Sequence, residues 1–143
     1  MIVLDTNVIS EIMRETPDER VMAWLGRQKT LHLAVTTLTL AEIQRGLKRL
    51  PAGARRRKLE ASFAEFIARG FEGRILTFDE QAAATYGDVC ALRESKGLHA
   101  DPLDLMIAAV AKDADASLAT RNTGDFSQCG IKLINPWEFK TRG

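Results

Sequence analysis

The chain has few residues of the kinds used for disulfides, zinc binding or histidine chemistry. Its 143 residues include two cysteines and two histidines. Cys90 and Cys129 fit no metal-binding spacing, so we interpret them as packing residues of a reduced protein. We expect His32 to lie within a strand as a packing or surface residue, while His99 is close enough in sequence to Asp101 to contact a substrate.

Long apolar runs are also missing. No stretch of about 18 apolar residues is available to cross a bilayer. Asp5 interrupts the N-terminal apolar run directly after Leu4, which argues against a signal peptide. The contents of 45% hydrophobic and 27% charged residues are ordinary for a globular protein. We therefore expect a cytoplasmic protein with no membrane segment and a single domain over residues 1–143.

Neither sign of charge dominates. The net charge of +1 argues against a protein that binds nucleic acid over its whole surface, which would be clearly basic. Seven cations accompany the single acid Glu42 between Ala41 and Lys58. We expect a local positive surface beside at least one carboxylate. A solvated helix face followed by a linker is an equally good interpretation.

Several phosphate-handling and nucleophilic motifs are absent. The sequence contains neither a Gly-x-x-x-x-Gly-Lys-Ser/Thr loop nor a Gly-x-Ser-x-Gly elbow. An aspartyl phosphatase would need a second aspartate two residues after Asp5, where this chain has Asn7. These absences leave clustered carboxylates as the best remaining source of chemistry.

Short apolar runs alternate with segments of helical periodicity along the chain. We expect strands at Ile2–Leu4, Leu31–Val35, Arg74–Phe78, Ser117–Thr120 and Ile131–Ile134. We expect helices around Val8–Met13, Val21–Leu25, Leu40–Leu47 and Leu59–Ile67, from the N-cap Asp79 through Arg93, and from Pro102 to about Asp113. This order predicts a three-layer α/β/α fold with a central parallel sheet of about five short strands.

Three acids stand where such a fold places its chemistry. Asp5 follows the first strand, Glu42 lies in the first turn of the helix after the second, and Asp104 lies in the first turn of the helix before the fourth. Ligands of open α/β sheets bind at the carboxyl ends of the strands, so we expect these acids to converge there. Clustered carboxylates repel one another unless a cation is bound, and hard oxygen ligands select Mg²⁺ or Mn²⁺. The pattern predicts metal-assisted phosphodiester hydrolysis.

Each acid also has a purely structural interpretation. The run Thr39–Glu42 has the pattern of a capping box, in which Glu42 would bond back to the N-cap amide. The run Asp101–Asp104 combines an N-cap acid and a proline with an acid favoured by the helix dipole. Asp5 is itself able to cap the first helix.

Four blocks of sequence together resemble a known family. They are Met1–Glu11, Thr39–Ile43, Asp104–Ala109 and Ala119–Phe126. In this order and spacing they are similar to the PIN-domain toxins of the VapC family. The closing run Ile134–Trp137 is similar to the FitB-like subgroup, so the resemblance covers nearly the whole chain.

The resemblance implies a Mg²⁺- or Mn²⁺-dependent endoribonuclease of a type II toxin–antitoxin system. Such a protein is inhibited by a VapB-like antitoxin, usually forms a homodimer, and meets operator DNA only through the antitoxin. The family's metal ligands correspond to Asp5, Glu42 and Asp104. A fourth acid that is common in the family is replaced here by Asn122, with Asp125 nearby as a substitute, so the fourth ligand and a second metal stay open.

Neighbouring polar residues are expected to support this site. Thr6, Asn7 and Thr120 are candidates to orient ligands or water, although Thr6 and Thr120 serve equally well as strand-end caps. Arg121 and the Arg45–Lys58 cluster are candidates to steer RNA phosphates.

Two other functions compete with the nuclease toxin. One is a catalytically weak binding module with the same residues, which acts with its antitoxin in transcriptional autoregulation. The other is a nuclease for branched DNA, which is disfavoured because the chain has no long insertion to grip a duplex.

Overall fold

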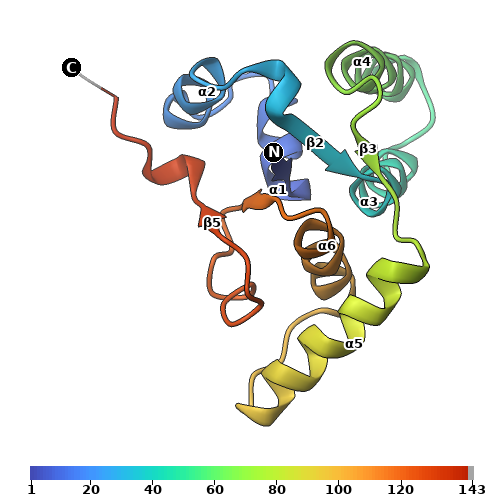
Figure 1. Cartoon of the computed structure of the whole chain (residues 1–143). Helices are drawn as coiled ribbons and strands as arrows, with labels where there is room; N and C mark the ends of the chain where they lie inside the picture. Colours follow the sequence, from blue (N-terminus) through green and yellow to red (C-terminus); the bar gives the residue numbers. More distant parts are fainter. Residues whose placement is uncertain (142–143) are drawn as a thin grey trace.

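The computed structural model describes residues 1–141, which form a parallel sheet between layers of helices (Figure 1). The strands are β1 (Ile2–Leu4), β2 (Leu33–Thr36), β3 (Ile75–Leu76), β4 (Ser117–Ala119) and β5 (Leu133–Ile134). The helices are α1 (Thr6–Ile12), α2 (Glu19–Gly26), α3 (Thr37–Lys48), α4 (Ala54–Gly70), α5 (Glu80–Ser95) and α6 (Pro102–Asp113), with 3-10 turns η1 (Thr30–His32) and η2 (Pro136–Glu138). The α/β/α architecture with five short parallel strands, predicted from the sequence, is confirmed.

Strand β1 lies at the centre of the sheet, whose order is β3-β2-β1-β4-β5. Val3 pairs with Ala34 of β2 on one side and with Leu118 of β4 on the other, and all four strand pairings are parallel. The carboxyl ends of β1, β2 and β4 therefore meet at one edge. Residues that directly follow these strands are brought together there.

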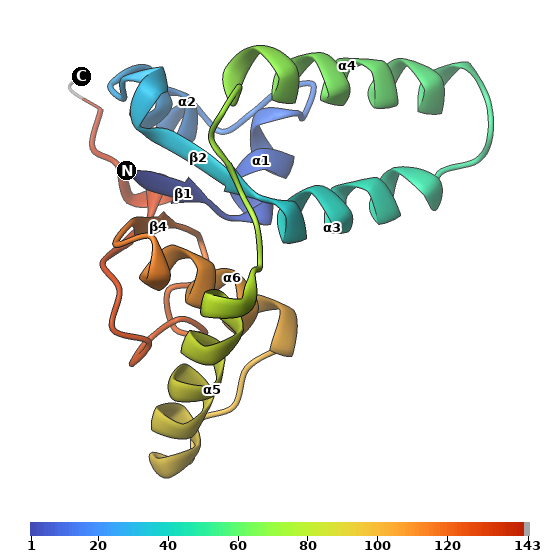
Figure 2. The ribbon, with the colours of Figure 1, turned by 45° about the vertical axis from the view of Figure 1, so that its right-hand side comes forward.

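Successive side chains of the short strands point to opposite faces of the sheet and pack in two separate hydrophobic cores. Leu4 and Val35 face the core built with α1 to α4, whereas Val3 and Leu118 face the core built with α5 and α6. Figure 2 shows α1, α2 and α4 on one side of the strands and α5 and α6 on the other. Burial of β1 on both faces explains its continuous apolar sequence.

Several element boundaries differ from the sequence predictions. The segment that precedes β2 forms the turn η1, so His32 is exposed and outside the strand. Strand β3 spans only Ile75–Leu76, because it pairs on one side only, with β2. The basic run that was expected to precede a helix lies inside the first turns of α4.

The start of α3 was also predicted wrongly. Its N-cap is Thr36, whose buried hydroxyl accepts a 3.1 Å hydrogen bond from the amide of Thr39. The N-cap thus lies three residues before the expected one, and Glu42 lies in the second turn of the helix. The capping-box interpretation is wrong, so the carboxylate of Glu42 is free to serve elsewhere. The predicted N-caps Asp79 and Asp101 are confirmed.

The remaining fold predictions concern the cysteines and the membrane. Cys129 is buried, Cys90 is half-buried, and both are free thiols that pack with the α5–α6 core. Over residues 1–141, no helix combines the length and the apolar content that a membrane crossing needs.

Candidate active site

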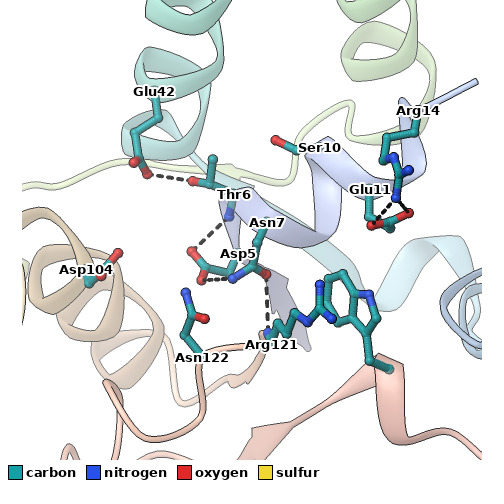
Figure 3. A pocket seen from close by; sticks show the side chains of 11 residues that line it. Asp5, Thr6, Asn7, Ser10, Glu11, Arg14, Glu42, Asp104, Arg121 and Asn122 are labelled. Carbon is teal, nitrogen blue, oxygen red and sulfur yellow. Dashed lines mark hydrogen bonds and ion pairs between the residues drawn. The ribbon is translucent and has the colours of Figure 1, made fainter. Parts of the chain in front are cut away.

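A pocket of about 470 Å³ opens at the edge of the sheet where β1 and β4 end (Figure 3). It is lined by Asp5, Thr6, Asn7, Ser10, Glu11, Arg14, Glu42, Asp104, Arg121, Asn122 and Trp137. The structure thus brings the three acids singled out from the sequence into the walls of one pocket. They come from the end of β1, the middle of α3 and the start of α6.

Asp5 is the most firmly held of the three acids. It is 3% exposed and caps α1, where its Oδ1 accepts a 2.8 Å hydrogen bond from the amide of Thr6. The hydroxyl of Thr120 donates to Oδ2 at 2.8 Å, and Nδ2 of Asn7 lies 3.3 Å from the same oxygen. Burial raises the pKa of Asp5, while the bonds from Thr120 and Thr6 oppose that rise. Asp5 is both a cap and a carboxylate at the pocket.

Glu42 reaches the pocket from α3 and is held by the first residue of α1. The hydroxyl of Thr6 donates a 2.6 Å hydrogen bond to Oε1 of Glu42 and lies 3.1 Å from the hydroxyl of Thr39. Thr39 is fully buried, so its hydroxyl gives the hydroxyl of Thr6 a fixed neighbour. Within residues 1–141, the second carboxylate oxygen of Glu42 accepts no side-chain hydrogen bond, and Glu42 lines the pocket.

Asp104 carries the clearest electrostatic signature of the site. Burial raises its pKa to about 6, helped by the negative charges of Asp5, Asp101, Glu42 and Asp125. Figure 3 shows Asp104 below Glu42 and to the left of Asp5, so that the three acids surround one space. The carboxylates repel one another at neutral pH, so bound positive charge would stabilise this arrangement.

The donor set fits a hard divalent cation, although it does not form a closed cage. Over residues 1–141, no three acidic, histidine or cysteine side chains lie close enough together to hold a metal ion as they stand. Mg²⁺ keeps several water ligands and uses one or two carboxylates directly, so acids spread around a pocket suit it. Asp5, Glu42 and Asp104 are the residues that would hold it, together with the amide oxygen of Asn122.

The segment after β4 supplies Asn122 but not Asp125. The amide of Asn122 donates to the hydroxyl of Thr120 at 3.1 Å, and the side chain of Asn122 lines the pocket below Asp5 (Figure 3). Asp125 is exposed and does not line the pocket, and it acts on Asp104 only through its charge. In this arrangement Asn122 is the better-placed candidate for a fourth ligand.

The sequence analysis missed part of the pocket wall. Glu11 is buried and is bound by Arg14 at 2.9 Å and by the amide of Asp18 at 3.0 Å. Glu11 is one turn after Asn7 on the same face of α1, so helical periodicity predicts it, whereas Arg14 lies beyond the end of that helix. Trp137 lies under Arg121, whose guanidinium carbon is 5.1 Å from the ring centre.

Comparisons with known proteins agree with this fold. A family model described as PIN domain matches residues 2–132. A VapC ribonuclease, Y4jK, from Sinorhizobium fredii and the toxin FitB from Neisseria gonorrhoeae are each 39% identical, over 96% of this chain and 99% of their own length. A solved structure of FitAB bound to an IR36 DNA fragment matches with a TM-score of 0.92 and 37% identity, covering 100% of both chains. The chain therefore belongs to the PIN-domain family, in the group of the VapC and FitB toxins.

Proposed function

We propose that this chain is the endoribonuclease toxin of a toxin–antitoxin pair and that it hydrolyses RNA with Mg²⁺ or Mn²⁺ bound at the acidic pocket. The observation that carries the proposal is the convergence of Asp5, Glu42 and Asp104 on one pocket, with the pKa of Asp104 raised to about 6. A ribonuclease among the relatives supports the choice of RNA.

The chain's own residues prepare the pocket for phosphodiester hydrolysis. When bound, a divalent cation supplies an activated water and stabilises the negative charge that develops on phosphate. Thr120 and Asn7 orient Asp5, and Thr6 orients Glu42, so two acids are fixed before substrate arrives. Asp104 is ionised at neutral pH and completes the negative wall.

A hollow beside the pocket holds two arginines that are candidates to bind a polyanionic substrate. It measures about 470 Å³, is lined by Arg45 and Arg49 together with Asp101, and shares Glu42 with the acidic pocket. Two other cations of the same run, Lys48 and Arg56, share the carboxylate of Glu60, at 3.1 and 2.7 Å. Arg45 and Arg49 are therefore the residues of this run best placed to bind RNA phosphates next to the acids.

An antitoxin is the partner that we propose for the neighbouring apolar groove. A hollow of about 270 Å³ between α1, α3 and α4 is lined by Met13, Ile43, Leu47 and Leu59 and reaches Glu42. Similarity to a toxin chain in a DNA-bound FitAB complex supports this role. Contact with operator DNA through the antitoxin, a homodimer and a cytoplasmic location remain parts of the proposal.

The proposal is tested by RNA cleavage with the purified chain, freed of any partner. We expect cleavage with Mg²⁺ or Mn²⁺ and none with a chelator. Asp5→Asn and Asp104→Asn should each lower the rate by more than about 100-fold, because supporting residues of metal sites alone contribute about 10–100-fold. Asp88→Asn, an exposed acid of α5 outside the pocket, is the control and should cut normally.

Two outcomes would contradict the assignment. Full metal-dependent cleavage by folded Asp5→Asn and Asp104→Asn proteins would remove these acids from the mechanism. A wild-type chain that cuts no RNA with either metal, yet binds its antitoxin, would instead be a binding module that acts in transcriptional regulation.

A further inference from the structure

Arg121 and Trp137 form a pair at the pocket that hydrolysis itself does not use. The guanidinium carbon of Arg121 lies over the indole ring, 5.1 Å from its centre, and both residues line the pocket that contains Asp5. The amide of Arg121 donates to Oδ1 of Asn7 at 3.3 Å, which ties this residue to the same network as Asp5. Arg121 stands on the opposite side of Asp5 from Glu42 (Figure 3).

Trp137 is a fixed wall rather than a mobile side chain. It is 5% exposed and packs in the core cluster with Val21 and Trp24 of α2. Its turn, η2, is capped by Asn135, whose Oδ1 accepts a 3.0 Å hydrogen bond from the amide of Trp137. The run Asn135–Trp137 therefore presents an indole at the edge of the pocket in one orientation.

Arg121 is exposed and has no carboxylate partner among residues 1–141. The nearby Glu11 is already bound by Arg14 and by the amide of Asp18. The guanidinium is thus held against the indole by a cation–π contact alone, and one face of this planar group is left for a ligand. An aromatic ring holds this surface arginine in place beside an acidic pocket. Such an arginine is suited to bind a planar or anionic ligand.

We propose that Arg121, backed by Trp137, is a stacking site for an unpaired RNA base next to the cleaved phosphodiester. Proteins that bind single-stranded RNA stack its bases on aromatic rings and on arginine planes. Both features coincide here, at the pocket that holds Asp5. The inference rests on the proposed function for its substrate, and it makes Arg121 a specificity residue, because purines and pyrimidines stack with different strength.

The test compares two labelled probes bound to the Asp104→Asn protein, in which we expect cleavage to be slowed by more than about 100-fold. One is a short unpaired RNA of mixed sequence, and the other is an abasic ribose-phosphate chain of the same length. We expect the RNA to bind about tenfold more tightly than the abasic chain, since stacking contributes on the order of 1–3 kcal/mol per base. Adding Arg121→Lys keeps the charge but removes the plane, and should abolish this preference while leaving binding of the abasic chain nearly unchanged.

Arg14→Lys is the matched control, because Arg14 lines the same pocket but pairs with Glu11. It should keep the preference for the base-bearing RNA. Trp137→Phe keeps an aromatic backing and should retain part of that preference. The proposal is overturned if Arg121→Lys keeps the full preference, if Arg14→Lys loses it equally, or if Arg121→Lys weakens only the complex with the antitoxin.

These readouts do not depend on catalysis. Failure of the wild-type chain to cut RNA would contradict the proposed function, and the binding comparison would still show whether Arg121 stacks on bases. A wild-type chain that cuts RNA but shows no base preference that depends on Arg121 would contradict the stacking site alone.

Discussion

The hydroxyl of Thr6 joins α1 to α3, because it donates a 2.6 Å hydrogen bond to Oε1 of Glu42. The amide of the same residue donates to Oδ1 of Asp5 at 2.8 Å. One threonine thus sets the position of two carboxylates that are far apart in the sequence. Its position as the first residue of α1 makes both contacts depend on the start of that helix.

Replacement of Thr6 by valine should loosen Glu42 without removing any acid. The concentration of Mg²⁺ needed for half-maximal RNA cleavage should rise about tenfold, the effect typical of losing a residue that orients a metal ligand. Thr6→Ser keeps the hydroxyl and should restore nearly wild-type metal dependence. Equal metal dependence in the valine and serine variants would show that the contact does not position Glu42.

Thr120 makes the corresponding contact to Asp5. Thr120→Val removes a buried donor to Oδ2, and the pKa of Asp5 should rise further, because that bond opposes the effect of burial. The acidic limb of the pH–rate profile should therefore move to higher pH, and stability should fall by about 1–3 kcal/mol. Thr123→Val, in the same loop but without a bond to Asp5, is the control. An unmoved pH profile would contradict this role for Thr120.

Asn122 offers a gain-of-charge experiment. Asn122→Asp adds a fourth carboxylate to the pocket, so metal affinity measured by calorimetry should increase about tenfold or more, as ligand charge increases. The metal-free protein should become less stable at neutral pH, because the new charge repels Asp104 and Asp5. Asp125→Asn is the companion variant and should lower the pKa of Asp104 with little change in metal affinity. Weaker metal binding by Asn122→Asp would show that this residue faces the ligand only through water.

The raised pKa of Asp104 predicts how stability depends on pH in the absence of metal. The folded protein holds the proton up to about pH 6, whereas the unfolded chain loses it near the ordinary value of 3.8. Stability is therefore highest below about pH 4 for this group and falls as the pH rises towards 6. Asp104→Asn should remove part of this decline, on the order of 1 kcal/mol after allowance for solvent screening.

Urea unfolding of the metal-free protein at a series of pH values measures this dependence. Asp88→Asn is the control for loss of one acidic charge. A decline that is the same in the Asp104→Asn and wild-type proteins would place the proton on another group. Saturating Mg²⁺ should flatten the wild-type curve, because bound cation favours the ionised carboxylates.

The two arginines in the hollow beside the acidic pocket predict a change in the salt dependence of RNA binding. Replacing both Arg45 and Arg49 by glutamine should weaken RNA binding and lower the slope of log affinity against log salt by about 1–2. The same change at Arg27 and Lys29, which are exposed and line none of the hollows described above, should alter the slope much less. Equal effects of the two double variants would show that only overall charge matters.

The sequence was sufficient to predict how strands and helices alternate along the chain and at which edge of the sheet the acids meet. Apolar runs bounded by polar residues identify buried parallel strands well, and Asp5 follows such a run directly. The start of α3 was harder to predict, because Thr36, Thr37 and Thr39 are all able to cap a helix and only tertiary packing selects Thr36.

The pocket was predicted in its acids but not in its walls. Asp5 directly follows an apolar run, and Asp104 lies in the first turn of a helix. Both positions can be recognised from the local sequence. Trp137 reaches the pocket only because β5 and η2 return beside α2, a long-range arrangement that no local pattern contains. Asp125 shows the reverse, since its nearness in sequence to Asn122 suggested a ligand that the chain direction turns away from the pocket.

The central position of β1 has a consequence for synthesis of the protein. The first strand to leave the ribosome pairs with β4, which is translated near the end of the chain, and the acids on α3 and α6 are useless until that pairing closes the sheet. Contacts between such distant segments form late in folding. The pocket, and with it the proposed activity, is therefore complete only after the C-terminal part of the chain has been added and β4 has joined the sheet.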